Sequence, residues 1–205
     1  MSIKFFLLFI ISAVLHAEIS KDELEESILD KIESIETFKS EFSQEQEWEL
    51  AGETSVSFGK IYMSGKNIYR IESGENYIIF NNNTVYRYND ETKQLLIELV
   101  REEDSGSVVP VKLIFEFPKY FDIADFEESK NGYKIFLTPK KINESFILSL
   151  TVYVNDDFIV EGIDVLDIDD NTSKYRLKKM IVNEDIDKEL FEQPKDSSIE
   201  IMDLR

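Results

Sequence analysis

Apolar residues in the middle of the chain come in short runs that favour β-strands. These runs are rich in β-branched and aromatic side chains, and Asn, Asp and Gly separate them. Turn signals return at a spacing of about eight to twelve residues, which is typical of antiparallel sheets. Several runs are apolar on both parities, so we expect protein or ligand to cover both faces of the sheet. The expected strands are residues 56–63, 68–71, 77–80, 85–88 and 95–100.

The same pattern continues on both sides of this central stretch. Asn131-Gly132 lies between two further runs and is the strongest hairpin signal in the chain. We therefore predict a mainly β protein with an antiparallel sheet. The six additional strands are expected at residues 37–46, 121–126, 133–138, 146–154, 158–166 and 175–182.

Two segments carry helical patterns instead. Ser20 and Glu23 have the spacing of a capping box. Apolar residues then recur at helical spacing and form one stripe that must pack on something, at Leu24, Ile28, Ile32 and Ile35. The apolar segment 110–115 favours a helical turn that begins at Pro110 and ends by Pro118. This turn fits a lid over the sheet and a buried crossover equally well.

The first 17 residues have the pattern of a signal peptide. Lys4 precedes an apolar run that ends near Leu15, and Leu15-His16-Ala17 resembles a cleavage site. The run is short for a membrane span, although an uncleaved anchor is the alternative. We expect cleavage near Ala17, export to the periplasm, and one domain over residues 18–205.

Composition narrows the chemistry that the exported protein can perform. There is no cysteine, and the only histidine, His16, lies in the expected signal peptide. His-based nucleophile systems and His-containing zinc sites are therefore excluded after cleavage. The net charge of −19, from 42 acidic and 23 basic residues, argues against nucleic acid and anionic lipid as partners.

One acidic stretch invites a calcium interpretation. Residues 164–171 contain Asp164, Asp167, Asp169 and Asp170, but they lack the Gly and Glu positions of an EF-hand loop. A solvated acidic hairpin explains the stretch better. No phosphate-binding Gly loop and no nucleophile elbow occurs. We expect no enzymatic activity, no metal and no cofactor.

Six stretches are similar, in the same order, to the motifs of one known family. They are residues 37–44 (TFKSEFSQ), 59–71, 82–89 (NNTVYRYN), 110–115, 133–140 (YKIFLTPK) and 190–191. The first resembles an F-x-A-x-F-x-Q strand, and the fourth falls where the family has a lid helix. The chain thus resembles the periplasmic outer-membrane lipoprotein carrier proteins (LolA type) of Gram-negative bacteria, over nearly all of the part that follows residue 17.

The resemblance implies both a fold and a function. The fold is an incomplete antiparallel barrel of about eleven strands covered by a helical lid. The function is to take triacylated lipoproteins from an inner-membrane ABC transporter, shield their acyl chains, and pass them to an acceptor at the outer membrane. By position in the family fold, the residues that face the acyl-chain cavity are Ile28, Ile32, Leu113, Ile114, Tyr69, Ile71 and Phe80.

The chain departs from the family at one position. Well-studied members carry an Arg in the second hairpin that holds the lid closed, and Gly65 stands there in this chain. The candidate replacements for this cation are Arg70, Lys66 and Lys60. How the lid closes, and whether a dedicated acceptor exists, therefore stay open.

Other functions remain as alternatives. A periplasmic sensor of lipids or lipoproteins would use the same apolar cavity. A hydrolase built on paired carboxylates would need a distinguishing motif, and a purely structural β-domain would have a closed core without a cavity. We expect a monomeric carrier that binds no nucleic acid.

Overall fold

The computed structural model describes residues 19–99, 110–141, 145–194 and 196–205. The predicted signal peptide, residues 1–17, lies outside the described residues. Within the described residues, no helix is both long and apolar enough to cross a membrane.

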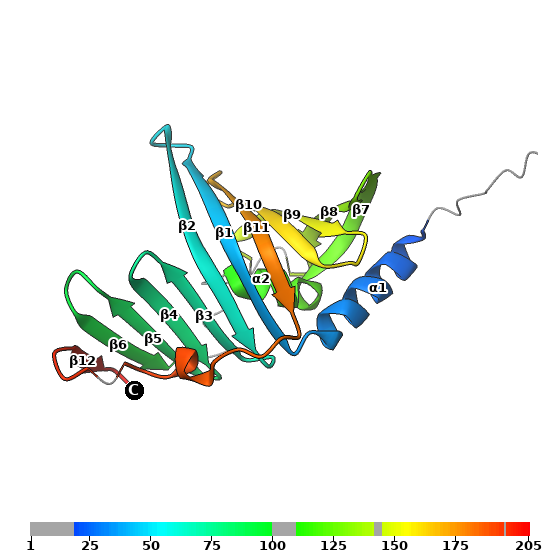
Figure 1. Cartoon of the computed structure of the whole chain (residues 1–205). Coiled ribbons are helices and arrows are strands. Elements are labelled where there is room, and N and C mark those ends of the chain that lie inside the picture. The colour runs from blue at the N-terminus through cyan, green and yellow to red at the C-terminus, as the bar shows by residue number, and fades with distance from the viewer. Residues whose placement is uncertain (1–18, 100–109, 142–144, 195) are drawn as a thin grey trace, which may run out of the picture.

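Twelve strands form one sheet in the order β12-β6-β5-β4-β3-β2-β1-β11-β10-β9-β8-β7. Strands β7 and β12 lie at its two ends and do not pair, so the sheet is not closed (Figure 1). The strands are β1 Thr37–Trp48, β2 Glu53–Ser64, β3 Ile68–Ser73, β4 Asn76–Asn81, β5 Thr84–Asn89, β6 Gln94–Leu99, β7 Phe121–Ser129, β8 Gly132–Pro139, β9 Ile147–Asn155, β10 Val160–Asp167, β11 Thr172–Val182 and β12 Glu200–Asp203.

The first eleven strands confirm the prediction of an antiparallel sheet. Each of the eleven predicted runs forms one strand, and consecutive neighbours in the sheet are antiparallel. Strand β12 was not predicted, and it pairs with β6 in parallel. Its four residues are exposed and half of them are acidic, so they carry no strand pattern of their own.

Helix α1, Lys21–Ser34, begins at the predicted capping box. The Glu23 backbone N–H donates to Ser20 Oγ at 3.3 Å, and the Ser20 N–H donates to Glu23 Oε2 at 2.9 Å. These bonds satisfy two helix-end N–H groups. The Ser20 N–H and the Ser20 hydroxyl both donate to the Glu23 carboxylate and hold the pKa of Glu23 below its ordinary value. Leu24 and Ile28 form the buried face of the helix, which contacts β7.

Helix α2, Pro110–Tyr120, is longer than predicted because Pro118 does not end it. Pro118 lies in the last turn, where proline removes only one backbone hydrogen bond. Lys140, beyond the end of β8, satisfies the free carbonyls of this turn. Its N–H donates to Tyr120 O at 2.9 Å, and its Nζ donates to Pro118 O at 2.7 Å. Strand β7 begins at Phe121, directly after the last residue of α2.

The main core lies on the concave face of the sheet, where Figure 1 shows α2 behind β1 and β11. Cross-strand register places one buried residue from each of five strands in a single row. The row consists of Phe38, Met63, Tyr69, Phe80 and Val85, all at most 7% exposed. Since residues paired across strands share a face, this row defines the concave side.

A smaller apolar layer lies on the opposite, convex face of β3–β6. The short 3-10 helix η3, Lys188–Phe191, contacts β3 and β4 there, and the chain then continues to β12. Phe191 and Ile79 are buried without belonging to the main core. The residues that share this face in register are Arg70, Ile79, Tyr86 and Ile97. The C-terminal segment thus covers the outside of this half of the sheet.

Candidate functional site

All seven residues predicted to face an acyl-chain cavity meet in one apolar cluster on the concave face. Ile28, Leu113, Ile114, Tyr69 and Phe80 are at most 7% exposed, and Ile32 and Ile71 are partly buried against the same cluster. Helices α1 and α2 bring four of these side chains to the sheet. Contact with an acyl chain stays a prediction for each of them.

Helix α2 is held on the sheet chiefly by aromatic packing. The Phe115 ring meets the edge of Phe38 at a centroid distance of 5.1 Å and stacks on Tyr69 at 6.4 Å. Phe117 is 2% exposed and joins the same cluster. Such ring pairs add about 0.5–1.5 kcal/mol each beyond the burial of their area. The sequence placed Phe115 in the apolar segment 110–115, but no sequence signal paired it with Phe38.

Among the described side chains, one polar pair links α2 to β3. The Tyr69 hydroxyl donates to Lys66 O at 2.5 Å and lies 3.5 Å from Glu116 Oε1 on α2. Burial, with the nearby Glu116 carboxylate, raises the pKa of Tyr69 well above its ordinary value. The hydroxyl therefore stays protonated and remains a donor beside Glu116. Sequence reasoning named Tyr69 for its ring and missed this polar contact.

The backbone explains why Gly65 stands where family members carry an Arg. Gly65 lies in the turn between β2 and β3 with φ of +69°, and its N–H donates to Glu36 O at 2.7 Å. Residues other than glycine rarely adopt this left-handed conformation. An Arg at this position would strain the turn, so the lid contact has to come from elsewhere.

Arg70, the first candidate for a lid-closing cation, points away from the lid. Its neighbour Tyr69 faces α2, and successive residues of a strand face opposite sides. Its Nε lies 2.7 Å from Glu72 Oε1, its Nη1 donates to Leu190 O at 2.9 Å, and its guanidinium lies 3.9 Å over the Tyr77 ring. In this structure Arg70 therefore fixes the C-terminal segment on the convex face, which corrects the predicted lid-closing role.

The two lysine candidates also do not bring an ammonium group to α2. Lys60 pairs in register with Glu72, so it shares the convex face with Arg70. Lys66 is exposed, and it is its backbone carbonyl that accepts the bond from Tyr69. The contact between lid and sheet rests on Tyr69, Glu116 and Phe115 instead.

The cavity found beneath α2 is small. A cavity of about 10 Å³ remains between α1, α2 and the strands, lined by Ile32, Phe38 and Ile114 among others. This is roughly the room that one water molecule needs. A larger cavity of about 380 Å³ lies elsewhere, beside Phe42, Phe58 and Gly59.

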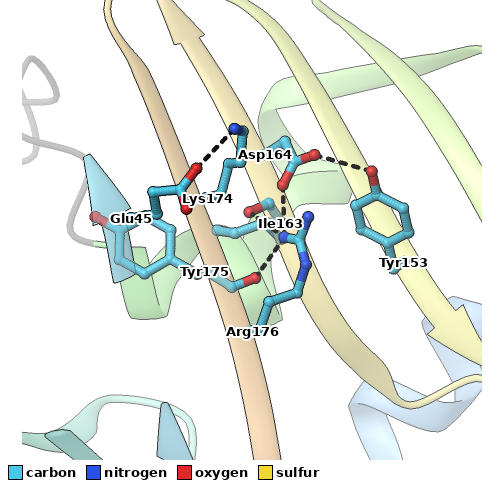
Figure 2. A network of polar contacts seen from close by, with 7 residues as sticks. All are labelled: Glu45, Tyr153, Ile163, Asp164, Lys174, Tyr175 and Arg176. Carbon is cyan, nitrogen blue, oxygen red and sulfur yellow. Dashed lines mark hydrogen bonds and ion pairs between the residues drawn. The ribbon is translucent and has the colours of Figure 1, made fainter. Parts of the chain in front are cut away.

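A network of polar side chains lies on β9–β11 and reaches β1 (Figure 2). Asp164 accepts from Tyr153 Oη at 2.8 Å and pairs with Arg176 Nη1 at 2.5 Å. The Arg176 guanidinium also lies 4.7 Å over the Tyr153 ring, and Lys174 pairs with Glu45 at 2.8 Å. Burial, together with the Asp164 carboxylate, raises the pKa of Tyr153. This network holds strands together.

The acidic stretch after β10 forms a hairpin turn. Asp167 Oδ1 accepts from the N–H groups of Asp169 and Asn171, both at 2.9 Å, so its carboxylate closes the loop. In the part of the chain that the structure describes, no three acidic or histidine side chains gather as a metal site would require. The stretch is a connection between β10 and β11 stabilised by its own side chains.

The family comparison agrees with this architecture. The model of the family "Outer membrane lipoprotein carrier protein LolA" matches residues 33–194. The chain therefore belongs to the LolA family, as the sequence resemblance indicated. A search of curated proteins finds no match.

Solved structures with little sequence identity share the fold. An uncharacterized conserved protein from Thermus thermophilus is 13% identical with a TM-score of 0.56, over 87% of this chain and 98% of its own. A DUF1329 family protein from Desulfovibrio piger is 11% identical with a TM-score of 0.51, over 84% and 97%. A putative outer membrane lipoprotein-sorting protein domain from Vibrio parahaemolyticus is 8% identical with a TM-score of 0.50, over 84% and 97%.

Proposed function

We propose that this member of the LolA family is a periplasmic carrier that binds the acyl chains of lipoproteins released from the inner membrane and delivers them to the outer membrane. The observation that carries the proposal is the apolar concave face, closed by a helix whose contacts with the sheet are mainly apolar. An inner-membrane transporter would load the carrier, and an acceptor at the outer membrane would unload it. No step in this cycle requires catalysis.

Acyl chains can replace α2 on the sheet because both present the same kind of surface. Leu113, Ile114 and Phe115 bury apolar area that an acyl chain would bury in their place. Each buried CH₂ group contributes about 0.8 kcal/mol, so a long chain can offset the loss of the α2 contacts. Loading and release then depend on a small difference in binding free energy between two apolar occupants of one site, α2 and the acyl chain.

The contacts of the C-terminal end of α2 suit the fixed end of a lid. Its C-terminal end is fixed, since Lys140 bonds both Pro118 O and Tyr120 O, and Phe121 begins β7 at once. Its middle is held by Phe115 packing and by the 3.5 Å contact between Tyr69 and Glu116. We infer that α2 moves about its Tyr120 end and uncovers the sheet from its other end.

The test is capture of a lipoprotein. The protein is produced with a triacylated lipoprotein, and native mass spectrometry then measures what the purified protein carries. We expect a bound lipoprotein for the unchanged chain and none for Leu113→Glu, which places a carboxylate in the apolar cluster. The matched control is Leu148→Glu, because Leu148 is 46% exposed on β9 and its replacement should leave binding intact.

A second measurement separates carrier from sensor. Spheroplasts that hold tagged lipoproteins in the inner membrane are incubated with the protein, and released lipoprotein is counted. A carrier releases them into solution. A protein that binds lipid but releases no lipoprotein would be a sensor that uses the same apolar cluster, and one that binds neither would refute the proposal.

A further inference from the structure

The concave side of β1 carries no charged residue, although its convex side is mostly charged. Successive residues of a strand face opposite sides, and the buried Phe38 and Phe42 mark the concave positions. These positions are Phe38, Ser40, Phe42, Gln44, Gln46 and Trp48, and the convex positions between them are Lys39, Glu41, Ser43, Glu45 and Glu47. Because both sets lie on one strand, the lack of charge is a property of the concave face and not of the composition.

Strand β2 continues this uncharged surface beside β1. On the same face, register pairs Gln44 with Ser57 and Gln46 with Ser55, and all four are partly or fully exposed. From Met63 outward, the first charged residue on this face of β2 is Glu53, at the end of the strand. β2 pairs with β3 only over Lys60–Met63, so no described strand borders Ser55 and Ser57 on their other side. Figure 1 shows this part of β1 and β2 extending beyond α2.

Register joins these residues to the apolar cluster on the same face. One row crosses the sheet through Leu150, Val165, Ser173, Gln46 and Ser55, and the next through Val152, Ile163, Tyr175, Gln44 and Ser57. The β9 and β10 ends of both rows belong to the core or pack against it, and α2 contacts β10. Neighbouring strands lie about 4.8 Å apart, so uncharged polar side chains begin one strand away from buried Tyr175. An amphiphile along these rows has its apolar part over β9 and β10 and its polar part over β1 and β2.

The polar ends of these rows form a patch, Gln44, Gln46, Ser55, Ser57 and Ser173, that offers hydrogen-bond donors. Gln46 Oε1 accepts from Ser173 Oγ and, at 3.3 Å, from Gln44 Nε2. These two bonds occupy the oxygen of the Gln46 amide and leave its nitrogen as a donor. No described residue accepts a hydrogen bond from Gln46 Nε2 or from the hydroxyls of Ser55 and Ser57. Uncharged donors of this kind complement carbonyl oxygens, which only accept.

We propose that this polar patch binds the ester and amide carbonyl groups through which the acyl chains of a lipoprotein join its first residue. The inference rests on the proposed carrier function and assigns the polar end of the same ligand. The acyl chains lie over the apolar ends of the two rows. Their carbonyl oxygens accept hydrogen bonds from Gln46 Nε2 and from the hydroxyls of Ser55 and Ser57. The protein part of the lipoprotein then leaves past the open side of β2.

Two synthetic triacylated lipopeptides test the proposal: one with ester-linked chains, and one in which ether links replace the esters. The ether analogue keeps the apolar chains and loses the ester carbonyl oxygens. Trp48 is the only tryptophan, is 40% exposed and lies on the concave side next to the patch, so its fluorescence reports binding. We expect the ester form to bind about tenfold more tightly or better, because the analogue leaves donors of the patch without acceptors. Equal binding of both would overturn the patch but leave the acyl-chain site intact, and binding of neither would refute both.

Matched variants locate the carbonyl site. Gln46→Leu removes the amide donors and Ser57→Ala removes one hydroxyl. Each should reduce the preference for the ester form about three- to tenfold without weakening binding of the ether analogue. Ser43→Ala is the control, because Ser43 lies on the convex side of β1, and it should keep the full preference. Leu113→Glu should instead weaken binding of both lipopeptides. A full preference in Gln46→Leu, or the same loss in Ser43→Ala as in Ser57→Ala, would refute the assignment.

Discussion

The concave and convex faces of the sheet differ in chemistry although they alternate residue by residue along the same strands. On the concave face, a row of buried apolar side chains crosses the sheet at Phe38, Met63, Tyr69, Phe80 and Val85. The adjacent residues of the same strands form the convex row, which contains Lys39, Tyr62, Arg70, Ile79 and Tyr86. The first row lies on the face that α1 and α2 pack against, and the second on the face that the C-terminal segment partly covers.

The difference lies in how each cover is held. Helix α2 is held by apolar burial, which has no direction and can be exchanged for another apolar occupant. The C-terminal segment buries Phe191 in the smaller apolar layer, but it is also held by directional bonds, such as Arg70 Nη1 to Leu190 O at 2.9 Å, which no acyl chain can replace. The proposed lid thus lies on the face whose cover can be exchanged, whereas directional bonds hold the cover of the convex face.

The largest change in the free energy of unfolding is expected for a substitution on β9, where two leucines can be compared. Leu150 is 1% exposed in the concave core, and Leu148 is 46% exposed. Leu150→Ala should lower the free energy of unfolding by about 2–5 kcal/mol, because it removes buried methyl groups and leaves a cavity. Leu148→Ala should change it by only about 0.5 kcal/mol. Urea denaturation measures both, and similar losses would mean that the two positions do not differ in packing as their burial indicates.

A smaller change in the free energy of unfolding is expected on the convex face, where substitutions of two arginines can be compared. The Arg70 side chain is 14% exposed and that of Arg176 is 40% exposed. Arg70→Met leaves Glu72 and Leu190 O without their partner and should cost about 1–3 kcal/mol. It should also speed hydrogen exchange in residues 186–191.

Arg176→Met is the matched control for Arg70→Met. Since its ion pair with Asp164 is more exposed, it should cost about 1 kcal/mol or less, and added salt should reduce the cost. Urea denaturation at low and high salt measures these differences. If Arg70→Met left exchange in residues 186–191 unchanged, Arg70 would not be what holds the C-terminal segment.

The smallest change in stability is expected at the polar contact under the lid. Tyr69→Phe removes the hydroxyl beside Glu116 and should cost about 0.5–1.5 kcal/mol. Its clearer effect should be faster hydrogen exchange in residues 113–120, because α2 loses its polar link to β3. Tyr175→Phe is the control: Tyr175 is 8% exposed in the same cluster, and burial raises the pKa of its hydroxyl to about 12. Faster α2 exchange in both variants would show that Tyr69 has no special part in closing the lid.

Much of this fold could be predicted because its signals are local. Alternation and turn residues predicted eleven strands, and Ser20 with Glu23 predicted the start of α1, since caps and strand patterns depend on residues within a few positions. The apolar identity of Leu113 and Ile114 likewise indicated which segment packs on the sheet. The end of α2 was predicted wrongly, because Lys140 supports the turn that contains Pro118 from far along the chain.

The role of Arg70, the existence of β12 and the unpaired edge of β2 could not be predicted, because they depend on contacts between distant parts of the chain. Arg70 looked like a cation for the lid, yet its face is set by strand register and its partner Leu190 lies 120 residues away. β12 has no strand pattern and exists because β6 offers it an edge. The sequence alone determined that β2 is a strand, but only the tertiary structure decided that Glu53–Gly59 has no neighbour, because β3 is too short to accompany it. Backbone alternation is a property of the nearby sequence, whereas a free edge depends on which other strands reach it.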